Sequence, residues 1–226
     1  MAEAPRVYLG PSLPLAEAER LLVADYHPPI RRGDLPTRYD GTVIIIDGEF
    51  GQSLSVSPNE ILRLLEGGTR IIGASSMGAL RAAELYPFGM EGCGWVFEAY
   101  RSGRIEADDE VALAYSPLDL QPLTVPLVNV RCWLEQLQTA GHIDPNRARW
   151  LLGRVRRVFY GDRTEERLRR EWEQLVGPEE LRRLYLALGG DITDIKAVDA
   201  RLALAVAAEW NADSLFRKEE LKYGHR

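Results

Sequence analysis

Residues 6–85 alternate short apolar runs with segments whose apolar side chains recur at helical spacing. The unbroken β-branched run over residues 42–46 is the clearest strand, because apolar residues at every position indicate burial on both faces, as in a parallel sheet. Shorter apolar runs over 6–9 and 70–74 predict two more strands. Helical spacing predicts helices over 15–24 and 77–85, and Ser57 with Glu60 forms a capping box that opens another helix between them.

Three strand–helix units in a row predict a right-handed, mostly parallel sheet with helices packed on it. The stretch over 26–34 is predicted to be a loop, because it is rich in proline and glycine. From about residue 127 the pattern becomes helical, with helices expected over 128–137, 144–160, 164–175, 178–188 and 195–210. We therefore expect an α/β fold: a parallel-sheet (Rossmann-like, doubly wound) core over residues 1–125, followed by a helical region over 126–226 packed on that core.

Composition and charge narrow the class of protein. Hydrophobic residues make up 46% of the chain and charged residues 27%, which is typical of globular proteins. The formal charge of −6 argues against a general nucleic-acid-binding protein. No apolar run approaches the roughly 20 residues of a membrane span, and residues 1–6 do not resemble a signal peptide. Because Cys93 and Cys132 are the two cysteines and cannot form a disulfide framework, we expect a cytoplasmic protein.

Small and reactive residues follow each of the three predicted strands. Gly10 and Ser12 follow the first strand, Asp47 and Glu49 the second, and a pair of serines the third. In an open parallel sheet, ligands bind beyond the carboxyl ends of the strands. These three loops are therefore expected to meet at one edge of the sheet.

The serine pair, Ser75 and Ser76, lies where a strand runs directly into a helix. Centred on Ser76, the sequence reads Ala-x-Ser-x-Gly, which is close to the nucleophile elbow of serine hydrolases. Amides at the following helix N-terminus would stabilise an oxyanion. The alternative is that Ser75 or Ser76 only caps the helix.

A serine nucleophile needs a base, and the histidines are His27, His142 and His225. Of these, His27 is the one expected to fold over the site from its loop. Asp47 or Glu49 is an alternative base if burial raises the pKa of its carboxyl group. The other interpretation of Asp47 is that it belongs to a turn.

Three further features have simple structural explanations. Arg81 is within reach of an anionic substrate bound near Ser76, but a local ion pair with Glu84 is the default. Asp108 and Asp109 could bind a cation, although a solvated acidic turn is the simpler interpretation, so no metal or cofactor is expected. Cys93 suggests a sulfur-carrying role, but no neighbour in sequence activates its thiol.

With these residues identified, the sequence resembles the TfuA family. The most specific match is Gly73-Ala74-Ser75-Ser76-Met77-Gly78-Ala79-Leu80-Arg81-Ala82-Ala83-Glu84-Leu85. Shorter matches extend the resemblance over residues 6–135: Val7-Tyr8-Leu9-Gly10-Pro11-Ser12-Leu13, Arg31-Arg32-Gly33-Asp34, Ile46-Asp47-Gly48-Glu49-Phe50, Glu60-Ile61, Phe88-Gly89-Met90, Tyr100-Arg101, Asp108-Asp109-Glu110-Val111 and Val128-Asn129-Val130-Arg131.

The resemblance implies an accessory role in peptide-backbone thioamidation by a YcaO enzyme, in the biosynthesis of ribosomally made peptides. It implies that the protein recruits a ThiS-like sulfur-carrier protein bearing a C-terminal thiocarboxylate and hydrolyses it to release sulfide. Catalytic roles would fall to Ser76, Ser75, Asp47 and His27. Substrate binding would fall to residues from the matched segments, namely Gly10, Ser12, Arg31, Arg32, Asp34, Glu49, Arg81, Arg101 and Asp109.

The sequence is also consistent with two other functions. The first is a non-catalytic adaptor, whose strand-end site grips the tail of the carrier protein and delivers it to YcaO. The second is a nucleotide- or phosphate-binding α/β domain, for which Gly10-Pro11-Ser12 is far from a dinucleotide fingerprint. The sequence leaves the oligomeric state open, a homo-oligomer included.

Overall fold

The computed structural model describes residues 3–51 and 54–223, with side chains as far as Asn211. The chain forms two compact units: Met1–Arg104 together with Ala197–Arg226, and Ile105–Lys196. These units are defined by internal packing. The expected division into an α/β core over residues 1–125 and a helical region over 126–226 stays a prediction.

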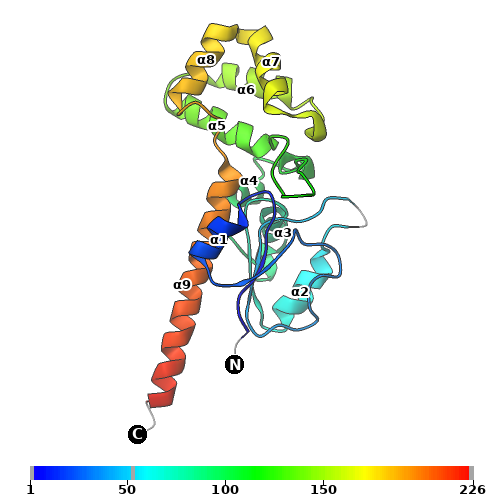
Figure 1. Ribbon diagram of the computed structural model, residues 1–226, viewed down its shortest axis with the longest axis vertical. Coiled ribbons are helices and arrows are strands. Elements are labelled where there is room, and N and C mark those ends of the chain that lie inside the picture. The colour runs from blue at the N-terminus through cyan, green and yellow to red at the C-terminus, as the bar shows by residue number, and fades with distance from the viewer. Residues whose placement is uncertain (1–2, 52–53, 224–226) are drawn as a thin grey trace. The chain divides into compact units, whose positions relative to one another are not determined.

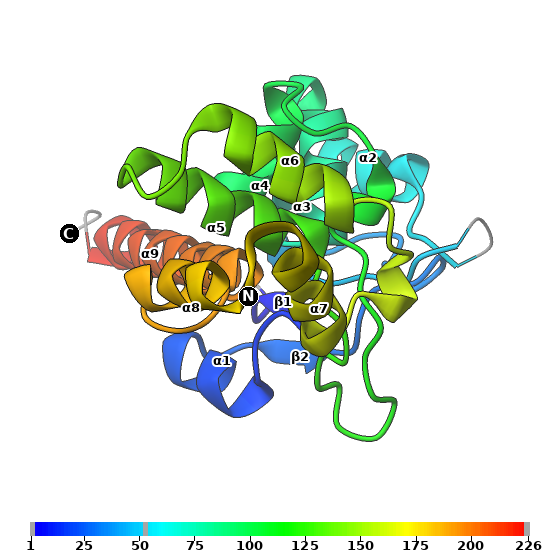
Figure 2. The ribbon, with the colours of Figure 1, turned by 90° about the horizontal axis from the view of Figure 1, so that it is seen from above.

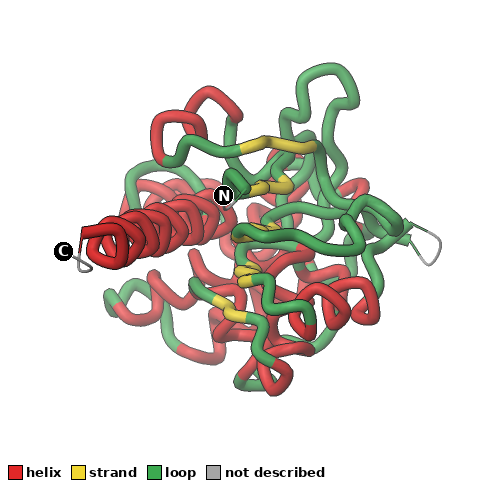
Figure 3. The backbone as a smooth tube through the Cα atoms, turned by 90° about the horizontal axis from the view of Figure 1, so that it is seen from below, coloured by secondary structure: helices red, strands yellow, loops and turns green. Residues whose placement is uncertain are grey.

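The first unit contains a five-stranded, all-parallel sheet in the order β2-β1-β3-β4-β5. Figure 1 shows the whole chain, and the strands are drawn in yellow in Figure 3. The central residues of neighbouring strands are in register, with Val7 beside Ile44 and Ile44 beside Ile72. All three side chains are buried. The predicted parallel α/β sheet is therefore confirmed, with strands β1 (Arg6–Tyr8), β2 (Asp25–His27), β3 (Thr42–Ile45), β4 (Arg70–Gly73) and β5 (Glu91–Gly92).

Helices cover both faces of this sheet. Side chains of α1 and α9 share one apolar cluster with Val7, Ile44 and Ile72 on one face, and Figure 3 shows the long C-terminal helix running beside the strands. Helices α2, α3 and α4 pack together, and α2 and α3 contact the sheet. The bounds are α1 (Leu15–Leu21), α2 (Pro58–Glu66), α3 (Met77–Leu85), 3₁₀ turn η1 (Tyr86–Phe88), α4 (Trp95–Arg101) and α9 (Ile195–Tyr223).

The prediction of a loop over residues 26–34 is wrong at its start. Tyr26 and His27 belong to β2, which pairs with β1 at the edge of the sheet, before Pro28 and Pro29 end the strand. The sequence pattern also does not predict helix α4 or strand β5. Strands β2 and β5 are only three and two residues long. They form through backbone hydrogen bonds to a neighbouring strand, and so short a segment shows little hydrophobic pattern in the sequence.

Helix α4 begins at a carboxylate supplied from far along the chain. The amides of Trp95 and Val96 donate to the two oxygens of Asp199 in α9, at 2.9 and 2.8 Å. Gly94 precedes them with φ +93°, and a Cβ atom there would overlap the Asp199 carboxylate. Burial raises the pKa of the Asp199 carboxyl group to about 6, although the two hydrogen bonds from these amides act to lower it. Asp199 therefore fastens the C-terminal helix to the start of α4.

The second unit is helical (Figure 2). Trp133, Trp172 and Tyr185 form its centre, with the two indole ring centroids 5.4 Å apart. The helix predicted over 144–160 is shorter in the structure and ends at Val155. The elements are η2 (Asp108–Glu110), α5 (Leu127–Thr139), α6 (Pro145–Val155), η3 (Tyr160–Asp162), α7 (Glu165–Val176) and α8 (Pro178–Ala187).

The described helices differ from helices that span a membrane. Within residues 3–51 and 54–223, none combines the length and the apolar character that a bilayer span requires. This includes α9, the longest helix, which places alanines against the sheet.

Two glycines allow α3 to lie directly on the sheet. A Cβ atom on Gly78 would overlap the carbonyl oxygen of Ile45 in β3, and one on Gly73 would overlap the carbonyl oxygen of Gly78. Ala79 and Ala82 on the same helix are fully buried. Only small residues fit here, so the position of α3 is set by close backbone contact.

We therefore predict that Gly78→Ala lowers the free energy of unfolding by about 3 kcal/mol or more, because the methyl group meets rigid backbone. The matched control is Gly153→Ala in α6, where a Cβ atom would meet nothing within 4 Å. That change should raise the free energy of unfolding by about 0.5–1 kcal/mol through helix propensity. Urea unfolding followed by circular dichroism measures both, and an unchanged stability for Gly78→Ala would contradict this packing.

Candidate functional site

The loops that follow the first four strands of the sheet meet at its carboxyl edge, as expected. A Cβ atom on Gly10, after β1, would overlap the ring of Pro29, after β2. One on Gly48, after β3, would lie 2.8 Å from Cγ of Met77, the first residue of α3. The backbone of Ile30 also exchanges hydrogen bonds with Asp47 and Glu49, both 3.0 Å long.

Asp47 holds this edge together. Its Oδ2 accepts hydrogen bonds from the amides of Gly10 and Ser12 at 2.9 and 3.0 Å, and its Oδ1 accepts one from the Ser12 hydroxyl at 2.6 Å. Asp47 and Ser12 are both buried. The structure thus brings Gly10, Ser12 and Asp47 together, and the carboxylate fixes the loop between β1 and α1.

A strained turn joins β4 to α3. The amide of Ser76 donates to the carbonyl oxygen of Ala74 at 2.7 Å, which closes a three-residue γ-turn around Ser75. Ser75 has φ +68°, a left-handed value that is uncommon for residues other than glycine. A γ-turn of this hand is rare, and such backbone strain costs on the order of 1–3 kcal/mol.

Strain of this kind is characteristic of a nucleophile on a sharp strand-to-helix turn. The turn is centred on Ser75 rather than on Ser76, where the sequence pattern had placed it. Gly73, two residues before Ser75, and Gly78, three residues after it, are the close-contact glycines described above. Their spacing about Ser75 is the signal in the sequence that would have identified the centre of the turn.

Neither serine side chain caps the helix. Ser76 occupies the N-cap position of α3 by its backbone, but its hydroxyl makes no capping hydrogen bond. The Ser75 Oγ is buried and has no hydrogen-bond partner among the described residues. Buried polar groups are nearly always hydrogen-bonded, so this hydroxyl calls for an explanation other than capping.

Both serines are closed to solvent, with 0% of Ser75 and 2% of Ser76 exposed. A substrate therefore reaches the Ser75 hydroxyl only when neighbouring side chains move. At the helix end, the amide of Gly78 donates to the carbonyl of Ile46 at 3.3 Å. The amide of Met77 has no partner among the described residues, so it can donate to an anion.

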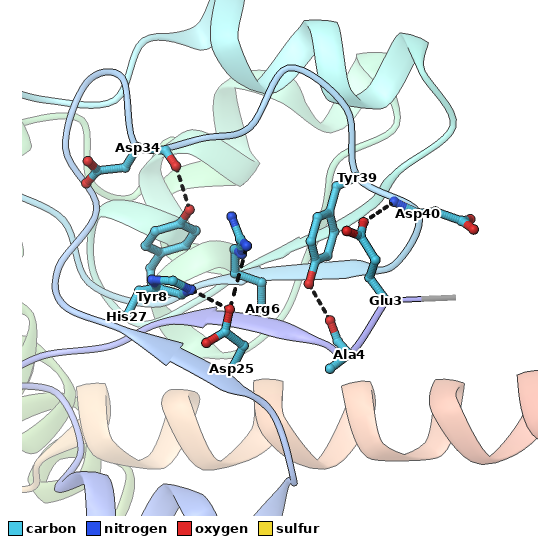
Figure 4. Close-up of polar contacts among 9 residues, drawn as sticks. All are labelled: Glu3, Ala4, Arg6, Tyr8, Asp25, His27, Asp34, Tyr39 and Asp40. Carbon is cyan, nitrogen blue, oxygen red and sulfur yellow. Dashed lines mark hydrogen bonds and ion pairs between the residues drawn. The ribbon is translucent and has the colours of Figure 1, made fainter. Parts of the chain in front are cut away.

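His27 is not brought to the serines. His27 pairs in register with Tyr8, Tyr8 with Ile45, and Ile45 with Gly73 at the end of β4. Three strand spacings of about 4.8 Å therefore separate His27 from the end of β4. Its Nε2 lies 2.7 Å from Oδ2 of Asp25, beside Tyr8 (Figure 4). The ring belongs to a polar cluster at the edge of the sheet.

His142 belongs to the second unit, and His225 lies outside the described residues. Within the described part of the chain, no titratable side chain forms a hydrogen bond with Ser75 or Ser76.

Four charged residues gather around the loops that follow β2 and β3. Arg31 pairs with Glu49 at 3.2 Å, and its amide donates to the Asp34 carboxylate at 2.7 Å. The amide of Arg32 donates to the carbonyl of Leu54 at 2.7 Å. Figure 4 shows Tyr8 reaching the same loop, where its hydroxyl donates to the carbonyl of Asp34. The sequence-predicted residues Arg31, Arg32, Asp34 and Glu49 thus lie together.

Arg81 is occupied by local contacts. Its ion pair with Glu84 is present at 2.6 Å, as expected, and its Nε donates to the carbonyl of Val56 at 3.0 Å. Arg81 therefore fastens α3 to the loop that precedes α2.

Arg101 belongs to the first unit and Asp109 to the second. Arg101 pairs with Glu98 on the surface of α4 at 2.7 Å. Asp109 lies 3.5 Å from the buried guanidinium of Arg163. Across the described ranges, no group of three or more histidine, cysteine or acidic side chains is arranged to hold a metal ion.

Cys93 follows β5 and is half-buried as a free thiol. Burial raises the pKa of its thiol to about 12, with Asp199 and Glu91 adding to the effect. The thiolate needed to carry sulfur is therefore strongly disfavoured in this structure.

The fold and the site define an α/β protein with a strained serine turn at the carboxyl edge of a parallel sheet. A profile of the TfuA-like protein family matches residues 47–164, just over half of the chain. The chain therefore belongs to the TfuA-like protein family, and membership indicates a role in thioamidation-related processes. The match includes Asp47, both serines and Asp109. No curated protein matches the chain.

The state of the Ser75 hydroxyl leads to a prediction about stability. Because its Oγ is buried without a partner, Ser75→Ala should raise the free energy of unfolding by about 1 kcal/mol. Ser102→Ala, at the end of α4, is the control, because the Ser102 hydroxyl donates to the carbonyl of Glu98 and its loss should not stabilise the protein. Urea unfolding measures both, and a destabilised Ser75→Ala protein would show that the hydroxyl is satisfied.

Proposed function

We propose that this protein releases sulfide from the C-terminal thiocarboxylate of a ThiS-like sulfur-carrier protein and supplies it to a YcaO enzyme that converts peptide amides to thioamides. Membership of the TfuA-like family supports the link to thioamidation. The single observation that carries the hydrolytic step is the strained, unpartnered Ser75 at the end of β4.

The chemistry is acyl transfer to Ser75 followed by hydrolysis. The Ser75 Oγ attacks the thiocarboxylate carbon, the C–S bond breaks, and sulfide leaves with the serine proton, so an ester forms between carrier and protein. Water then cleaves the ester, which regenerates the hydroxyl and leaves a carboxylate on the carrier. The net reaction consumes one water and yields one sulfide and one ordinary C-terminus.

The helix that follows the turn supports the charged intermediate. The Met77 amide stands at the N-terminus of α3, where the helix dipole favours negative charge. The amide of Ser76 is held within the γ-turn by Ala74. Oxyanion stabilisation therefore falls on Met77, and additionally on Ser76 if the turn opens as the substrate enters.

A second function is favoured by the burial of both serines. In it the protein acts as a non-catalytic adaptor that binds the carrier tail at the loop cluster of Arg31, Arg32, Asp34 and Glu49 and delivers it to YcaO. The serine turn would then only shape the edge of the sheet.

Sulfide release by the purified protein separates the two functions. With a carrier thiocarboxylate and no YcaO enzyme, the wild type should release sulfide, and Ser75→Ala should reduce the rate by about a hundredfold or more, as loss of a nucleophile does. Ser76→Ala should have a smaller effect, and Ser102→Ala should have none.

Two results would reject the hydrolytic proposal. One is sulfide release by Ser75→Ala at the wild-type rate. The other is a wild type that releases no sulfide by itself but binds the carrier and stimulates thioamide formation by YcaO, which is the behaviour of an adaptor.

A further inference from the structure

The second unit contains a cleft of about 780 Å³ at the end of α6 and the start of α7. Four arginines line it, namely Arg154, Arg157, Arg167 and Arg170. None of the residues expected to bind substrate lines this cleft, and the proposed hydrolysis does not use it. We call it the arginine cleft.

The segment around the cleft is positively charged, whereas the chain as a whole is negatively charged. Residues 147–171 contain nine arginines and four acidic residues, a formal charge of +5, whereas the whole chain carries −6. A negatively charged partner is therefore repelled by most of the protein and attracted to this segment. Charge complementarity of this kind guides encounter and selects the partner.

Two of the arginines are held in fixed positions. Glu171, which is buried, lies 2.5 Å from Nε of Arg154 and 2.8 Å from a terminal nitrogen of Arg167. One carboxylate thus orients two guanidinium groups and leaves one positive charge uncompensated. Guanidinium groups that are already oriented bind a further carboxylate with a smaller loss of conformational entropy.

Arg157 and Phe159 complete the cleft. Arg157 is exposed, and none of the ion pairs within the described residues involves it. Phe159 is 61% exposed, and its ring centroid lies 4.3 Å from that of Tyr160. Arginine and aromatic side chains are both enriched at protein interfaces, and Arg157 and Phe159 line the same cleft.

We infer that the arginine cleft docks an acidic peptide segment of a partner protein, in which carboxylate side chains alternate with apolar ones. The carboxylates bind Arg157 and the uncompensated charge of the Arg154–Arg167 pair, and an apolar side chain packs on Phe159. The acidic residues Asp162 and Glu166 also line the cleft. Glu166 pairs with Arg170 at 2.7 Å. These carboxylates interrupt the positive charge along which a continuous row of phosphates would lie, which favours a peptide with separated carboxylates over a nucleic acid.

The inference is tested by fluorescence anisotropy with the full-length protein and a labelled synthetic peptide in which glutamate alternates with leucine. A peptide with glutamine in place of glutamate is the neutral probe, and a single-stranded RNA of similar length is the competing class. The acidic peptide should bind more tightly than both, and its affinity should fall as salt is added.

Two neighbouring arginines provide matched variants. Arg157→Glu should weaken binding of the acidic peptide by about tenfold or more, because a bidentate, charge-assisted contact becomes a repulsion. Arg156→Glu makes the same change of charge one residue earlier, where the side chain does not line the cleft. It should weaken binding by less than about threefold, since it acts only through screened, longer-range charge.

Phe159→Ala should weaken binding without changing the salt dependence. The inference is overturned if the acidic peptide does not bind, if Arg156→Glu and Arg157→Glu weaken it equally, or if RNA binds more tightly and loses its affinity in Arg157→Glu. These measurements do not depend on sulfide release, so the proposal for the arginine cleft and the proposal for Ser75 can fail independently.

Discussion

The close approach of α3 to the sheet governs the arrangement of the candidate site. The Gly78 Cα faces the carbonyl oxygen of Ile45, and no Cβ atom fits between the helix and β3. To bring the helix this near, the chain must reverse within three residues after β4, and the γ-turn at Ser75 accomplishes this with a left-handed φ. The strain at Ser75 is therefore coupled to the packing of the whole helix. That packing holds Ser75 in a backbone conformation that a serine outside this context would avoid.

Much of the first unit could be predicted from the sequence, because its central strands and helices carry strong local signals. The β-branched run before Asp47 became β3, and Ser57 with Glu60 forms the capping box that opens α2. The edge strands could not be predicted, since two or three residues form a strand only through pairing with a neighbour. The convergence of the loops followed from the topology of parallel sheets, whereas the one-residue difference between Ser76 and Ser75 depends on a backbone angle.

Several polar residues with the chemistry of catalytic groups have structural partners here. Asp47 accepts three hydrogen bonds from the loop after β1, and His27 pairs with Asp25. A sequence shows that a carboxylate or an imidazole follows a strand, but not which neighbour satisfies it. Ser75 differs from both, because its hydroxyl is buried without a partner in a strained turn, and these two properties together single it out.

The central claim is that Ser75 becomes acylated. The most direct test is to mix the protein with a carrier thiocarboxylate, stop the reaction with acid within the first turnovers, and locate any covalent adduct by peptide mass spectrometry. The account predicts an ester between the carrier C-terminus and Ser75, absent from the Ser75→Ala protein. An adduct on Ser76 or Cys93, or sulfide release with no adduct at any time point, would contradict it.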